Sequence, residues 1–247
     1  MLGGGRAANE AQGFRATQAR VVALARRAGR LAMNQRAGPY AVRLISLHRA
    51  SALLLLTFVL LHVANHLVSL QSVALHLAVM SALRNVYRRP VVEFMVLTCA
   101  AFQAASGLAL VARGWFSRTG FVARLQRISG AYLAFFLIAH VSAVLYGRLV
   151  LGLDTNFYYA AAGLHVHPFA WFFAPYYFLA VLALFVHLGC ASYWRCLRSR
   201  RRATGWVLLA SAASAGVIVS LLITASLGGA FEAFRIPSEY TTTYGAR

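Results

Sequence analysis

The sequence predicts an all-α integral membrane protein, a bundle of five transmembrane helices preceded by a basic amphipathic helix. Two observations support this prediction. Sixty per cent of the 247 residues are hydrophobic, and the 24 basic residues, all arginine, gather in blocks between long uncharged stretches. A soluble domain of this length would need many more charges to cover its surface than five acidic residues and these arginines supply. A β-structure is excluded because an open sheet leaves backbone groups unpaired in lipid.

Five stretches with at most one charged residue each are long enough to cross a bilayer, which takes about 20 apolar residues at about 1.5 Å each. They cover residues 50–70, 90–112, 128–146, 168–194 and 204–228. Because the connections are short, neighbouring helices should be antiparallel. The chain then divides into a basic amphipathic N-terminal segment (1–43), the five-helix transmembrane domain (44–230) and an exposed C-terminal tail (231–247), which we expect to serve as a docking element.

The distribution of arginine predicts the orientation of the helices. Nine arginines lie in residues 1–49, four in 113–127 and five in 195–202, which are all on the side of the N-terminus. The positive-inside rule therefore places the N-terminus inside. Residues 15–36 are typical of an amphipathic helix on the anionic inner surface of a bacterial inner membrane. The same Arg-rich segment is also compatible with a mitochondrial presequence, so a mitochondrial membrane is the alternative location.

Two of the apolar segments share a pattern, R-x-S-[AG]-x9-H-V. It begins at Arg49 and again at Arg127, and its histidines are His62 and His140. The two segments cross the membrane in the same direction, so the histidines should lie at matching depth and face one another. A lone histidine in a membrane helix often only bonds a nearby serine or carbonyl, but ionisable groups within the bilayer are rare and usually functional.

The serines of the repeat, Ser51 and Ser129, each precede their histidine by eleven residues. Eleven residues turn a helix by about 1100°, or three turns and about 20°, so serine and histidine share one face. We expect the small serines to leave room for a flat group. A haem b between the two helices, with His62 and His140 as axial ligands of its iron, would use this arrangement.

Three further histidines are candidates at this stage. His66 lies one turn beyond His62, but its counterpart in the second copy of the repeat is Val144, so His62 is the favoured ligand and His66 is a candidate contact to a haem propionate or to the outer surface. His187 lies in the inner half of the fourth span. It is a candidate ligand of a second haem, with His48 as its partner, and otherwise lines a quinone pocket or packs.

The five-helix layout, the stretches 48-HRASA-52 and 127-RISG-130, and the histidines on successive helices resemble the membrane-anchor cytochrome b subunits of succinate dehydrogenase and fumarate reductase, over about residues 44–228. The resemblance implies a quinone site that contains Arg49, Ser51, Arg127 and Ser129. It also implies haem ligands at His62, His140 and His187, while Gln103 stands where the family has a fourth histidine. That departure puts a two-haem arrangement in question.

We therefore expect a haem b protein that exchanges electrons with quinone, as a subunit without catalytic apparatus of its own. The sequence contains no nucleotide, flavin or iron–sulfur motif, so a soluble dehydrogenase-type subunit would be a separate chain on the inner side. Membrane lipids are the other expected partners, and nucleic acid is not. The alternative is a non-redox membrane scaffold or lipid-homeostasis protein on the same fold, because the sequence also resembles uncharacterised relatives that are not known to have a dehydrogenase partner.

Two remaining patterns have simpler explanations. The stretch 152–177 contains Asp154, His165 and His167, and an H-x-H motif can bind copper or zinc. The many aromatic residues of this stretch are better explained as an interfacial belt. The three cysteines, Cys99, Cys190 and Cys196, suggest neither a disulfide framework nor a zinc site.

Overall fold

The computed structural model describes residues 39–112 and 119–245. Within these two ranges the chain is helical and contains no strand, so the all-α prediction is confirmed. The chain divides into two compact units, residues 1–47 and 48–247. Of the first unit, the structure describes only the start of helix α2, and the amphipathic helix expected at 15–36 lies outside the described residues. The second unit contains the rest of α2 and all the other elements discussed below.

Among the residues that the structure describes, five helices are long and apolar enough to cross a membrane, as the sequence predicts. They are α2 (Pro39–Val68), α4 (Pro90–Ala112), α5 (Phe121–Leu149), α7 (Ala170–Arg198) and α8 (Arg202–Leu227). Helix α5 begins seven residues before the expected span. Arginine is a good helix former and its long side chain can carry the charge back to water, so Arg124 and Arg127 extend the helix without breaking it.

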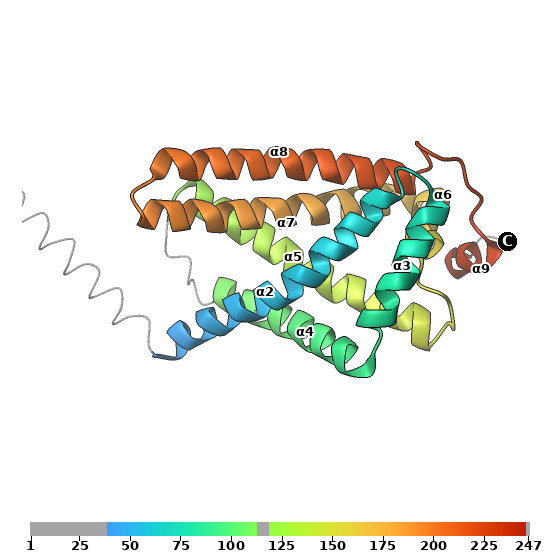
Figure 1. The fold of residues 1–247 in the computed structure, drawn as a ribbon, viewed down its shortest axis with the longest axis horizontal. Helices are drawn as coiled ribbons and strands as arrows, with labels where there is room; N and C mark the ends of the chain where they lie inside the picture. Colours follow the sequence, from blue (N-terminus) through green and yellow to red (C-terminus); the bar gives the residue numbers. More distant parts are fainter. Residues whose placement is uncertain (1–38, 113–118, 246–247) are drawn as a thin grey trace, which may run out of the picture. The chain divides into compact units, whose positions relative to one another are not determined.

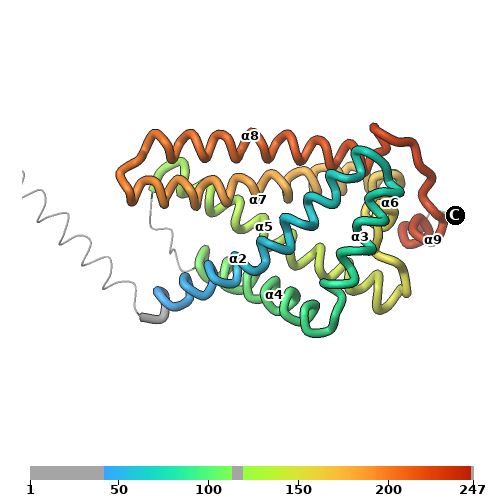
Figure 2. The backbone as a smooth tube through the Cα atoms, in the orientation of Figure 1, coloured from blue at the N-terminus to red at the C-terminus, as the bar shows by residue number. Residues whose placement is uncertain are grey.

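Helices α7 and α8 lie side by side along their length (Figure 1). Between them and the start of α5 lies a buried cluster made by Val122, Val186, Cys190, Tyr193 and Leu209. Figure 2 shows the chain reversing direction at the short turn between α7 and α8. We call this end of the second unit, which carries arginines 195–202, the basic end, and the opposite end the cap end.

Two helices at the cap end were expected as short loops. They are α3 (Val73–Tyr87) and α6 (Phe157–His165). Each begins at a polar capping residue, since the hydroxyl of Ser72 accepts a bond from the backbone N–H of Leu75, and the side chain of Asn156 accepts from the N–H of Tyr158 and of Tyr159. Phe157 is fully buried against Val73, Ile223 and Leu227. The two connections that were expected to be short loops therefore contain helices that pack together as a cap.

Most residues of the C-terminal tail are exposed, and a few of them pack into this cap. It contains helix α9 (Ser238–Thr241) and a 3₁₀ turn (Thr242–Tyr244). The carboxylate of Glu232 accepts a 2.6 Å bond from the backbone N–H of Val73, at the positive end of α3. Phe234 packs edge-on against Phe157, and Tyr240 is 2 % exposed. Burial of these aromatic residues offsets part of the chain freedom that the tail loses.

Candidate haem and quinone site

His62 of α2 and His140 of α5 meet inside the unit, with ring centres 6.1 Å apart and ring planes at 60°. The spacing fits two axial ligands of one iron. An imidazole with C–N bonds of about 1.33 Å has its centre about 1.1 Å from each ring atom. With metal–nitrogen bonds of about 2.0–2.1 Å, two opposed imidazoles have centres about 6.3 Å apart. The angle between the planes does not exclude ligation, because a metal–nitrogen bond sets the direction from ring to metal and not the rotation of the ring about that direction.

A free metal ion is a poorer fit to this pair. Among the side chains of residues 42–112 and 119–245, no group of three or more His, Cys, Asp and Glu residues is placed to hold a metal ion. A haem requires only two protein ligands here, because the porphyrin supplies the other four nitrogens.

Each of the two imidazoles stacks on a phenylalanine one helical turn earlier. Phe58 lies parallel to His62 at 5.8 Å, and Phe136 lies parallel to His140 at 5.0 Å. Neither phenylalanine is among the expected site residues, although the repeat contains both as F-x3-H-V. The repeat therefore covers ring packing as well as the histidines, and the phenylalanines restrict how each imidazole can turn.

Towards the cap, the pair continues into a chain of histidines. The ring centre of His66 is 4.8 Å from that of His62 and 5.2 Å from that of His76 on α3. The Nδ1 atom of His66 is buried without a hydrogen-bond partner. His76 is 1 % exposed, and its Nδ1 donates a 2.7 Å bond to the backbone carbonyl of Asn65. His66 thus lies between the candidate ligand and the cap.

His76 should make the cap sensitive to acid. Burial lowers the pKa of His76 below its ordinary value of 6.5, so the unfolded chain binds the proton more readily than the folded one. The contribution of neutral His76 to stability is full above pH 6.5 and is lost as the pH falls below it, at up to about 1.4 kcal/mol per pH unit. We expect the melting temperature to fall between pH 7.5 and pH 5, measured by circular dichroism in detergent.

The variant His76→Gln removes this titration and should flatten the pH dependence, while His167→Gln, at an exposed position, should leave it unchanged. The ring of His66 contacts His76, and the charge of Arg84 also acts on it. An unaltered pH dependence in His76→Gln would assign the acid sensitivity to another group.

A second polar cluster lies nearer the basic end and joins four helices. His48 of α2 bonds Ser106 of α4 at 2.7 Å, and His187 of α7 bonds Ser129 of α5 at 3.3 Å. The amide of Gln103 donates to the hydroxyl of Ser51 at 2.6 Å. We call these six residues the polar cluster. Ser106 is a member that no sequence pattern indicated, because its role depends on how α4 is rotated against α2.

The hydrogen bonds assign the tautomers of both histidines in the polar cluster. The hydroxyl of Ser106 donates to the backbone carbonyl of Phe102, and that of Ser129 donates to the carbonyl of Gln126. Each serine oxygen therefore accepts from an Nδ1–H of imidazole, which leaves the Nε2 lone pair available. A histidine that donates through one nitrogen and offers the other is prepared to bind a metal.

The structure separates the serines from the histidines of their own repeat. Ser51 and Ser129 lie about 16 Å along the helix from His62 and His140, and their hydroxyls bond groups of the polar cluster. They are therefore not placed directly beneath the His62–His140 pair, as the shared helical face suggested. Serine and histidine share one face of the helix, but the rise of eleven residues along the axis places them at different levels.

The two arginines of the repeat differ in exposure, because Arg49 is exposed and Arg127 is half-buried.

A glycine faces each histidine of the polar cluster. A Cβ atom at Gly130 would lie 3.0 Å from Cε1 and 3.3 Å from Nδ1 of His187, whereas one at Gly107 would lie 3.7 Å from Cε1 of His48. The imidazole of His48 is also close enough to His187 to act on it electrostatically. The two rings, each against a glycine of another helix, therefore occupy neighbouring positions in the polar cluster.

The glycines provide a matched pair of variants. Gly130→Ala should destabilise the protein by about 1–3 kcal/mol, because the new methyl group overlaps the ring of His187. Gly107→Ala should be neutral or stabilising by up to about 1 kcal/mol, because 3.7 Å is an ordinary contact and alanine favours helix. Thermal unfolding of both variants in the same detergent measures the difference. Equal melting temperatures would mean that His187 moves aside without cost.

The candidate metal ligands of the cap are engaged elsewhere. The carboxylate of Asp154 bonds Arg84 at 2.7 Å, and Nε2 of His165 bonds the backbone carbonyl of Leu227 at 2.9 Å. His167 is exposed. The structure therefore does not bring the H-x-H motif and Asp154 together as ligands.

Comparison with protein-family models, with curated proteins and with solved structures finds no match for this chain. Within the described residues, fold and site define an all-α protein with five helices long and apolar enough to cross a membrane and two clusters that contain histidines from different helices.

Proposed function

We propose that the protein is a b-type cytochrome of the membrane, which binds haem between His62 and His140 and transfers electrons to or from quinone. The observation that supports this most directly is the 6.1 Å separation of the two imidazole centres, close to the separation that bis-histidine ligation requires. When bound, the haem supplies a one-electron carrier. The protein contributes the two ligands, the phenylalanines that orient them and an apolar surrounding.

The polar cluster is the proposed quinone site. Quinone oxygens need hydrogen-bond donors, and a bound quinone would draw them from the hydroxyls of Ser51 and Ser129 and the amide of Gln103. In this structure those groups bond one another and nearby backbone carbonyls, so they would exchange these partners for the quinone. Arg127, two residues before Ser129 and half-buried, can add a charge-assisted bond. Arg49 occupies the equivalent position of the repeat beside Ser51. An exchange of electrons between this site and the haem would then take place within the bundle.

His48 and His187 favour a second candidate use of the same cluster. Their available Nε2 atoms and the facing glycines suit a second bis-histidine haem. Haem content distinguishes the two uses, because a quinone site gives one haem per chain and a second haem gives two.

The orientation and partners of the protein follow from this proposal. The positive-inside rule places the basic end, and with it the polar cluster, on the inner side of a bacterial inner membrane. A soluble dehydrogenase-type subunit would then exchange electrons with the quinone site from that side. The resemblance to the anchors of succinate dehydrogenase and fumarate reductase agrees with such a partner.

The absorption spectrum of the purified protein tests the proposal. We expect an oxidised Soret band that shifts and sharpens on reduction with dithionite, together with split visible bands. A colourless protein, purified from cells supplied with haem precursors, would overturn the proposal and leave the non-redox scaffold or lipid-homeostasis protein as the better function.

A further inference from the structure

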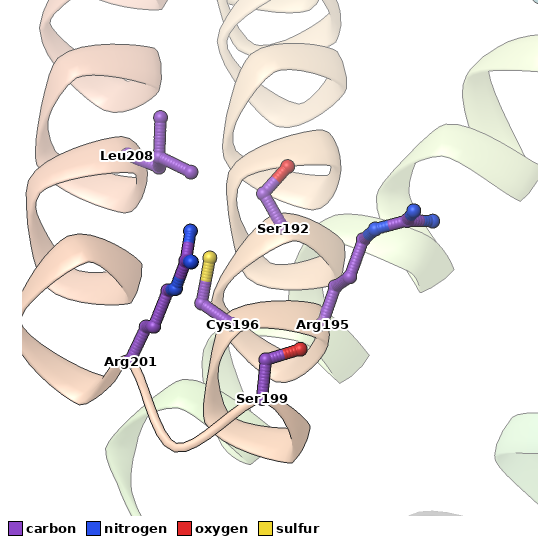
Figure 3. A pocket seen from close by; sticks show the side chains of 6 residues that line it. All are labelled: Ser192, Arg195, Cys196, Ser199, Arg201 and Leu208. Carbon is purple, nitrogen blue, oxygen red and sulfur yellow. The ribbon is translucent and has the colours of Figure 1, made fainter.

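A pocket of about 510 Å³ opens at the basic end, where α7 turns into α8. Its lining consists of Ser192, Arg195, Cys196, Ser199, Arg201 and Leu208. Figure 3 shows Arg201 rising beside Leu208 on one side and Arg195 extending on the other, with the two hydroxyls and the thiol between them. The pocket is distinct from the histidine sites, which share no residue with it.

The charge of this pocket is positive and not compensated. Its lining contains two guanidinium groups and no carboxylate. The three ion pairs found among the described residues are at the cap end, and none involves residues 195–202. Three more arginines, at positions 198, 200 and 202, add to the positive potential of the same turn. The pocket therefore attracts anions.

The backbone holds the two sides of the pocket in place. Arg200 adopts a left-handed conformation with φ of 59°, which reverses the chain after α7. The N–H of Arg201 donates a 2.9 Å bond to the carbonyl of Cys196, and that of Ser199 donates to the carbonyl of Arg195. These bonds satisfy the last carbonyls of α7. The backbone of Arg201 is thus held against the end of α7, the helix that carries Arg195.

We infer that this pocket binds the phosphate of an anionic phospholipid headgroup. Guanidinium forks and serine hydroxyls are the donors that phosphate oxygens prefer. The pocket lies at the ends of two helices long and apolar enough to cross a membrane, and the phosphates of a bilayer crossed by these helices would lie near such ends. Leu208, the seventh residue of α8 and exposed, continues the pocket along the apolar surface of the helix. The acyl chain of a lipid would lie along that apolar surface. A lipid therefore fits the pocket better than a free anion does.

Binding of phosphatidylglycerol carrying an acyl-chain fluorophore to the full-length protein in neutral detergent micelles tests the inference, measured by fluorescence anisotropy. Phosphatidylcholine with the same fluorophore is the comparison. We expect the double variant Arg195→Gln/Arg201→Gln to weaken phosphatidylglycerol binding about tenfold or more. It should leave phosphatidylcholine binding unchanged. Because the protein is purified before the measurement, altered insertion of the variants does not affect the result.

The matched control is Arg198→Gln/Arg202→Gln, which removes the same charge from the same turn without changing the pocket lining. Less than about threefold weakening there supports a defined site. Equal weakening in both double variants would overturn it, because the preference would then come from the general positive charge of this end. Circular dichroism of each variant serves as the control for folding.

The source of the phosphate is tested separately. Inorganic phosphate, added at constant ionic strength, should not displace phosphatidylglycerol at millimolar concentration, and Leu208→Gln should weaken lipid binding several-fold by removing the apolar edge. Displacement by millimolar phosphate, with lipid binding intact in Leu208→Gln, would show that the pocket takes a free anion and would overturn the lipid assignment.

Discussion

Replacing His62 with Ala is expected to abolish the low-spin haem spectrum of the purified protein while helix content and membrane insertion remain normal. Loss of a direct ligand should cost more than the 10–100-fold in affinity that loss of a group bonded to a ligand typically costs. His140→Ala should have the same effect, because the two rings form one pair with centres 6.1 Å apart. The ratio of haem to protein and the visible spectrum measure both effects.

The control for this prediction is His66→Ala. His66 is 4.8 Å from His62 but belongs to only one copy of the repeat, so its removal should preserve the low-spin spectrum. The opposite outcome, a normal spectrum in His62→Ala and its loss in His66→Ala, would place the ligand one helical turn nearer the cap. If haem were retained in all three variants, the haem would have to bind at another level, with His48 and His187 as its candidate ligands.

The pairing of His62 with His140 was predictable because two kinds of regularity agree. The repeat places both histidines at the same distance from the start of a parallel span, and helical rise converts equal distance into equal depth. The same reasoning was incomplete for Ser51 and Ser129. Helical periodicity describes the face that a residue occupies, but eleven residues of rise move it to another level of the bundle, where it meets other helices.

The polar cluster and the cap were less predictable for a physical reason. The bond between His48 and Ser106 depends on the rotation of α4 against α2, and no repeat or spacing encodes that angle. The bond between Glu232 and the backbone of Val73 joins residues 159 positions apart. Such contacts form only when whole helices pack against one another. The local sequence pattern therefore predicts the helices but not the contacts between them.

The entry of electrons from quinol is expected to depend on Arg127. If its guanidinium bonds a quinone oxygen beside Ser129, Arg127→Leu should slow reduction of the haem by a short-chain quinol about 10–100-fold, the loss of one charge-assisted hydrogen bond. Haem content should not change, because Arg127 lies about 20 Å along α5 from the ligand His140. Arg49→Leu should have a smaller effect, since Arg49 is exposed and Arg127 is half-buried.

Arg124→Leu is the matched control, because it removes the same charge one turn earlier on α5, from an exposed position. Stopped-flow reduction at saturating quinol, followed at the Soret band, separates the rate of electron transfer from quinol affinity. A loss confined to Arg127→Leu would support direct contact with quinone, because the general field of the basic end is reduced equally in both variants. If both variants reduce haem at the wild-type rate with normal spectra, then Arg127 acts only as a positive-inside anchor of the helix, and the quinone must bind away from this arginine.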